Sequence, residues 1–95
     1  MEQIERISYM EQILDEATEA VSSLSEALEK YSAVQDKLQE LAAYYSSKQW
    51  HQDFDDDSAS KIPNNLKRGV LSEDAVYNLL VDVTDLKAHL KKLAD

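Results

Sequence analysis

Three aspartates at alternate positions, Asp53, Asp55 and Asp57, have the spacing of the first ligands in a calcium-binding loop. Such a loop needs a glycine at its sixth position, where the chain turns sharply, and a bidentate glutamate at its twelfth. Counted from Asp53, these two positions hold Ser58 and Asn64. The segment therefore favours a solvated acidic loop over a calcium site.

His51 lies two residues before Asp53, so an imidazole and nearby carboxylates could act as metal ligands or as a general base. This leaves a metal-binding protein that uses His51, Asp53 and Asp55, within the 51–57 segment, as one alternative. A surface histidine beside a buried Trp50 is the commoner arrangement. We assign no catalytic, cofactor-binding or metal-ligating residue and expect no cofactor.

The residue inventory excludes several enzyme classes. The chain has no Cys, one Gly and one Pro, so it lacks thiolate chemistry, disulfides and glycine-rich phosphate loops. It has no Ser-His-Asp or Gly-x-Ser-x-Gly arrangement. Its many carboxylates fall on a polar helix face, whereas a general acid needs an apolar pocket that raises its pKa. We therefore expect a protein that is not an enzyme.

Two adjacent cations, Lys67 and Arg68, precede Gly69 and could hold an anion. The positive end of the following helix is already occupied by acidic residues, which argues against an anion there. Ion pairs with the acidic residues of 55–57 or of the N-terminal half are the favoured interpretation.

Most of the aromatic residues gather in one short stretch, at Tyr44, Tyr45, Trp50 and Phe54. Such a cluster is typical either of a binding hot spot or of a plug that closes one end of a helical core. We expect Trp50 and Tyr45 to form the plug. Tyr44 lies one position off the apolar seam and is the better candidate for an exposed contact.

The neighbourhood of this cluster supplies the candidate surface for a protein partner. It combines aromatic, cationic and acidic residues with the lone glycine, and its predicted members are Tyr44, Trp50, Asp53, Phe54, Leu66, Lys67, Arg68, Gly69, Glu73 and Asp74.

The 95-residue chain carries 10 basic and 19 acidic side chains, for a net charge of −9. Residues 1–47 account for most of this excess, residues 48–71 are neutral, and residues 72–95 are weakly acidic. Nucleic acid and anionic membranes repel such a chain, so we expect neither as a partner. The acidic start, with no apolar segment after it, predicts a cytoplasmic protein.

Apolar residues recur at alternating steps of three and four through residues 1–47, which predicts one long amphipathic helix. A second row follows every seven residues, so the apolar stripe is three positions wide in each heptad. The main seam is Ile7, Met10, Leu14, Ala17, Val21, Leu24, Leu28, Tyr31, Gln35, Leu38, Ala42 and Tyr45, and the second row is Ile13, Ala20, Ala27, Val34 and Leu41.

A second helix is predicted over 72–95, with Ser72 as its N-cap and a hydrophobic staple between Leu71 and Val76. The segment 48–71 is predicted to be a structured connection. Within it, residues 53–60 form a loop, Pro63 opens a short turn and Gly69 ends it in the left-handed conformation.

These elements predict a single all-α domain over 1–95, in which the two helices form a helical hairpin. The first helix would be about 69 Å long and the second about 32 Å, so one cannot cover the other. Either the long helix is continuous and pairs with a second chain in a coiled-coil-like dimer, or it breaks near Ser22 and gives a compact three-helix bundle. The unbroken heptad phase favours the dimer.

A run of nine residues of mixed chemistry extends from Leu66 to Asp74, and helix periodicity alone does not account for it. Further residues belong to the same pattern, namely Glu5-Arg6-Ile7, Met10-Glu11, Tyr44-Tyr45-Ser46, Trp50, Asp53, Pro63, Ala75 and Tyr77. In these residues the chain resembles a small bacterial family, the domain-of-unknown-function family number 4298. The resemblance spans nearly the whole chain, and the run from Leu66 to Asp74 is its most specific part. The segment 56–62 departs from the family pattern, which implies a different turn in the same fold. The family implies no activity.

The sequence thus predicts a non-enzymatic helical protein that acts by binding another protein and forms a homodimer. The self-association face is predicted at Ile7, Met10, Leu14, Val21 and Leu24. An acidic inhibitor that mimics DNA, with its carboxylates along the first helix, is the alternative from a different class.

Overall fold

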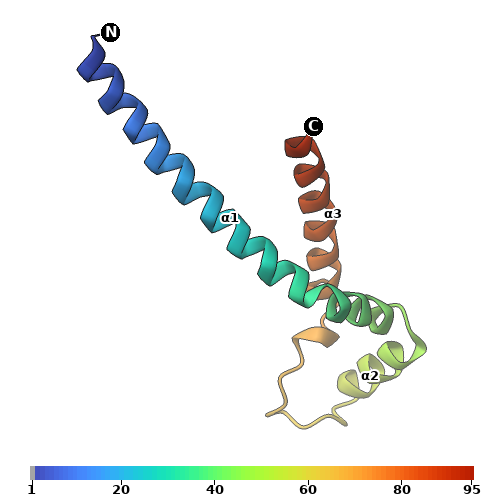
Figure 1. Cartoon of the computed structure of the whole chain (residues 1–95). Coiled ribbons are helices and arrows are strands. Elements are labelled where there is room, and N and C mark those ends of the chain that lie inside the picture. The colour runs from blue at the N-terminus through green and yellow to red at the C-terminus, as the bar shows by residue number, and fades with distance from the viewer. Residues whose placement is uncertain (1) are drawn as a thin grey trace. The chain divides into compact units, whose positions relative to one another are not determined.

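A computed structural model describes residues 2–95 and is all-α, with no strand among these residues. Its elements are α1 (Gln3–Tyr45), α2 (Lys48–Ser58), the short 3₁₀ helix η1 (Gly69–Leu71) and α3 (Ala75–Ala94) (Figure 1). A long N-terminal helix and a C-terminal helix joined by a structured connection are therefore confirmed.

Helix α1 runs without interruption through Ser22, where the three-helix alternative placed a break (Figure 1). The segment is rich in Ala, Leu, Glu and Gln, which are strong helix formers, and it contains no Gly, Pro or Asn. The prediction of a continuous helix is confirmed.

The contacts divide the chain into two compact units, Met1–Asp36 and Lys37–Asp95. The described part of the first unit is a single stretch of α1. Its predicted self-association residues are all exposed, with exposed fractions of 54% for Ile7, 53% for Met10, 57% for Leu14, 68% for Val21 and 49% for Leu24.

The second unit begins with the last turns of α1 and continues into α2. The hydroxyl of Ser47 accepts a hydrogen bond from the Trp50 amide at 3.2 Å and so caps the start of α2. The prediction of a loop over residues 53–60 is wrong, because α2 continues to Ser58. Although Asp and Ser weaken a helix, Trp50 and Asp57 lie at helical spacing and bind Val70 and Arg68 outside α2.

Helix α2 ends in a Schellman motif. The amide of Ser60 donates to the carbonyl of Asp57 at 3.0 Å, and the amide of Lys61 donates to that of Asp56 at 2.9 Å. Ser60 takes the left-handed conformation, with φ of 61°. The prediction that Gly69 is left-handed is wrong, because its φ is not positive and it opens η1 instead.

The predicted turn after Pro63 is present, since the amide of Leu66 donates to the carbonyl of Pro63 at 3.2 Å. Helix α3 begins at Ala75, three residues later than predicted. Ser72 still acts as a cap, because its hydroxyl accepts from the Ala75 amide at 3.2 Å.

The small core of the second unit contains one residue from each of three elements. Among the described residues, the buried hydrophobic side chains are Trp50 of α2, Leu71 of η1 and Val76 of α3, with exposed fractions of 7%, 7% and 4%. Element η1 contacts both α2 and α3. Both residues of the predicted staple, Leu71 and Val76, are therefore core residues.

Candidate protein-binding site

Trp50 is the centre of the aromatic cluster in the second unit. Its indole Nε1 donates a hydrogen bond to the carbonyl of Val70 at 2.9 Å, which ties α2 to η1. The ring of Tyr45 meets it edge-on at 5.1 Å between centroids, and the ring of Phe54 stacks on it at 5.2 Å. Trp50 is buried, as the plug interpretation requires.

Tyr44 is half-buried, which corrects the prediction of an exposed contact. Its hydroxyl donates to Oδ2 of Asp53 at 2.6 Å and ties the end of α1 to α2. This hydrogen bond, together with partial burial and the negative charge of Asp53, raises the pKa of Tyr44 to about 12. The heptad position of Tyr44 correctly places its side chain outside the apolar seam. It does not reveal that α2 folds back beside Tyr44 and partly covers it.

Tyr45 makes the connection to the start of α3. Its hydroxyl donates to the backbone carbonyl of Glu73 at 3.1 Å. The same ring packs against Trp50, so one side chain contacts both the aromatic cluster and the segment that leads into α3. The two adjacent tyrosines therefore fix two different segments.

Arg68 forms an ion pair with Asp57, with 2.8 Å between Nη1 and Oδ1. Both side chains are largely covered, with exposed fractions of 30% and 25%. The interpretation that these cations pair with residues 55–57 is confirmed for Arg68. Lys67 is exposed and makes no ion pair with any residue from 2 to 95.

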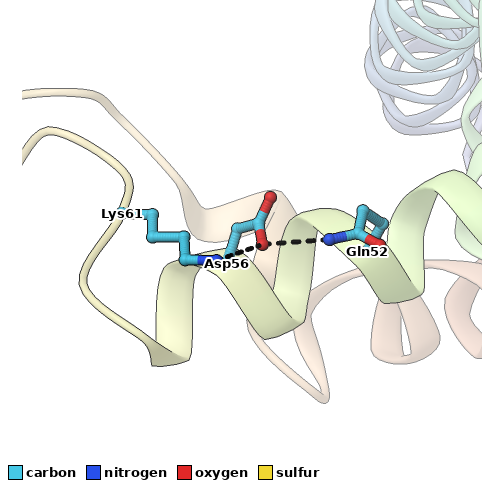
Figure 2. A network of polar contacts seen from close by, with 3 residues as sticks. All are labelled: Gln52, Asp56 and Lys61. Atoms are coloured by element: carbon cyan, nitrogen blue, oxygen red, sulfur yellow. Dashed lines mark hydrogen bonds and ion pairs between the residues drawn. The ribbon is translucent and has the colours of Figure 1, made fainter.

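A smaller polar network lies at the C-terminal end of α2 (Figure 2). The amide group of Gln52 donates to Oδ1 of Asp56 at 3.0 Å. The ammonium group of Lys61 lies 3.9 Å from the same oxygen, and the Lys61 side chain is 70% exposed. This pair is solvated and contributes little to stability.

The acidic segment has a different geometry from a calcium loop. In a helix, residues two apart point about 200° away from each other, so Asp55 faces away from Asp53 and Asp57. Asp53 accepts from Tyr44, and Asp57 accepts from Arg68. No group of three or more His, Asp or Glu side chains suited to a metal ion occurs in the part of the chain that the structure describes.

The predicted partner-binding residues fall into two groups. Trp50 is buried, and the half-buried ones are Tyr44, Asp53, Phe54 and Arg68. These five residues form the internal framework of the second unit. The exposed ones, Leu66, Lys67, Gly69, Glu73 and Asp74, form what we call the connection surface.

Sequence reasoning did not identify two residues that hold the framework in place, namely Ser47 and Val70. Ser47 had a usable signal, because serine is among the residues preferred at an N-cap. Val70 contributes a backbone carbonyl, and no side-chain pattern can indicate that.

No helix within residues 2–95 is long and apolar enough to cross a membrane. Searches of curated proteins and of solved structures gave no match. One family model, described as a domain of unknown function (DUF4298), matches residues 7–92. This match covers most of the chain and includes α2, the connection surface and nearly all of α3. The chain therefore belongs to the DUF4298 family.

Proposed function

We propose that this protein is a non-enzymatic helical protein that binds other proteins, and that it forms a homodimer through the apolar stripe of its first unit. One observation carries the proposal. In α1 of this unit the residues of the stripe from Ile7 to Leu28 are aligned on one face and exposed. A soluble helix with such a face is normally stabilised by packing against a partner.

The apolar side chains on this face can supply the energy that holds a dimer together. Full burial of a Leu, Val, Ile or Met side chain contributes about 1.5–3 kcal/mol. The large hydrophobic side chains on or beside this face between residues 4 and 28 that are at least 39% exposed are Ile4, Ile7, Met10, Ile13, Leu14, Val21, Leu24 and Leu28. Burial of this set in each of two copies would offset the cost of association, which is about 4–15 kcal/mol.

The stripe is also free of charge. The acidic side chains Asp15, Glu19 and Glu26 lie on the opposite face by heptad position. Two copies can therefore bring their stripes together without placing these carboxylates in contact, although residues 1–47 carry a net charge of −7.

The connection surface is the second part of the proposal and would bind a different protein. It presents Leu66, 56% exposed, beside one cation, Lys67, and two acids, Glu73 and Asp74. The framework beneath it is held by the indole of Trp50 and the ion pair of Arg68, so it is preorganised for binding.

The dimer is tested with the double variant Leu14→Ala/Val21→Ala. Static light scattering at micromolar concentration should give a dimer for the natural chain and a monomer for the variant. The matched control Glu19→Ala/Glu26→Ala changes the polar face and should remain dimeric. The fluorescence of Trp50, the sole tryptophan, should be unchanged in both variants because it reports on the second unit. A monomeric natural chain would contradict the proposal.

The connection surface is tested by affinity capture with a variant that spares the framework. Leu66→Ala/Lys67→Ala should lose proteins that the natural chain retains, and the fluorescence of Trp50 should not change. Changing Arg68 would be a poor test, because its ion pair with Asp57 is structural. Equal capture by the variant and the natural chain would contradict a binding role for this surface.

A further inference from the structure

We infer that the stripe binds a second copy of the chain in the antiparallel orientation, with Ala20 at the centre of the paired segment. This inference rests on the proposed homodimer and adds its orientation and register. It uses only the α1 residues of the first unit.

The two flanks of the apolar seam differ in polarity. In heptad notation, Ile7, Leu14, Val21 and Leu28 occupy position a, and Met10, Ala17, Leu24 and Tyr31 occupy position d. One flank, position g, is apolar and holds Ile13, Ala20 and Ala27. The other flank, position e, is polar and holds Glu11, Thr18 and Ser25.

This asymmetry distinguishes the two orientations. In a parallel pair of helices each g residue faces an e residue of the partner, so Ile13 would lie against a polar flank. In an antiparallel pair g faces g and e faces e. Only the antiparallel orientation places apolar flank against apolar flank and polar flank against polar flank.

The register follows from matching a positions with d positions of the other copy. One alignment within the first unit pairs every seam residue from 7 to 31: Ile7 with Tyr31, Met10 with Leu28, Leu14 with Leu24, and Ala17 with Val21. It places Ala20 opposite Ala20 of the second copy.

Two further features support this register. The centre of the paired segment has small side chains, so the two backbones can approach closely there. On the polar flank, Glu11 meets Ser25 of the second copy, so no acid on this flank faces another acid.

The absence of native cysteine makes disulfide trapping a direct test. Met10→Cys, Leu14→Cys and Leu24→Cys are prepared as single variants and oxidised alone or in mixtures. We expect no interchain disulfide from any variant alone, because the two copies of residue 10 would lie about 27 Å apart and those of residue 14 about 15 Å apart. The mixture of Leu14→Cys and Leu24→Cys should form a heterodisulfide.

A control mixture combines Met10→Cys with Leu14→Cys, which the register places about 21 Å apart along the axis, and should stay uncrosslinked. Efficient disulfides from single variants would show a parallel pair and overturn the inference. Failure of the Leu14→Cys and Leu24→Cys mixture, when both variants are still dimeric under reducing conditions, would overturn the register. A monomeric natural chain in light scattering would instead overturn the proposed homodimer itself.

Discussion

The hydroxyl of Tyr44 donates a hydrogen bond to the carboxylate of Asp53 across 2.6 Å, and this contact joins the end of α1 to α2. The phenol can donate only while it is protonated. The contact therefore connects the position of α2 to the ionisation of a single side chain.

Tyr44→Phe should remove a pH-dependent part of the stability. The hydrogen bond to Asp53 raises the pKa of Tyr44 from 10.0 to about 12 in the folded state. Its contribution is thus fully present below pH 10 and is lost as the pH rises from 10 to 12. At pH 8 we expect the variant to lose about 1 kcal/mol of unfolding free energy, measured by urea denaturation with circular dichroism.

The difference between the two proteins should shrink as the pH approaches 12. Absorbance at 295 nm follows the ionisation of the five tyrosines and provides a second measurement. The step near pH 12 that belongs to Tyr44 should be missing from the titration of the variant. An equal stability difference at pH 8 and pH 12 would contradict this assignment.

Trp50→Phe should destabilise the second unit although it keeps an aromatic ring. It removes the donor to the Val70 carbonyl and leaves a smaller ring among Tyr45 and Phe54. We expect a loss of about 1–3 kcal/mol, read from the thermal or urea transition by circular dichroism. Gln49→Ala, an exposed change in the same helix, is the control and should alter stability little.

The ion pair between Arg68 and Asp57 is suited to a double-mutant cycle with Arg68→Met and Asp57→Asn. Because both side chains are largely covered, we expect a coupling free energy of about 0.5–1 kcal/mol. Lys67→Met in place of Arg68→Met should show no coupling to Asp57→Asn. A coupling near zero for Arg68 would indicate that the pair is solvated in the folded protein.

Two backbone substitutions should act in the same direction at different positions. Ser60→Gly should stabilise the protein by about 0.5–1 kcal/mol, because Ser60 is left-handed and glycine adopts this conformation without strain.

Gly69→Ala should also stabilise the protein, by about 0.4–1 kcal/mol, since no atom lies within 4 Å of the added Cβ and the φ angle of Gly69 is not positive. A loss of stability in Gly69→Ala would contradict this prediction.

The long helix was predictable because its signal is redundant. The heptad pattern recurs from Ile7 to Tyr45, and no residue in α1 breaks a helix. The plug formed by Trp50 was also predictable, because a lone tryptophan in a small chain has few places to be buried. The charge of Arg68 indicated an ion pair with an acidic residue, and residues 55–57 were one of the two partners that the sequence offered.

Helix α2 was not predictable by the same reasoning. Its sequence is rich in Asp, which has low helix propensity, and the order comes from contacts made by Tyr44, Val70 and Arg68 with residues that are distant in sequence. Local propensity therefore indicated a loop where tertiary contacts stabilise a helix. The left-handed conformation was assigned to Gly69 because glycine is its usual residue, whereas the Schellman motif falls on Ser60.

The two ties from α2, Trp50 to Val70 and Asp57 to Arg68, hold the ends of the intervening loop together from both sides. The loop between α2 and η1 is therefore not needed to hold the core of the second unit together. Its turn at Asn64 and Asn65 is exposed. Doubling the length of a loop that is already closed costs only about 0.6 kcal/mol. The junction between Asn64 and Asn65 is therefore a place where a peptide epitope or a fluorescent label can be inserted without unfolding the protein.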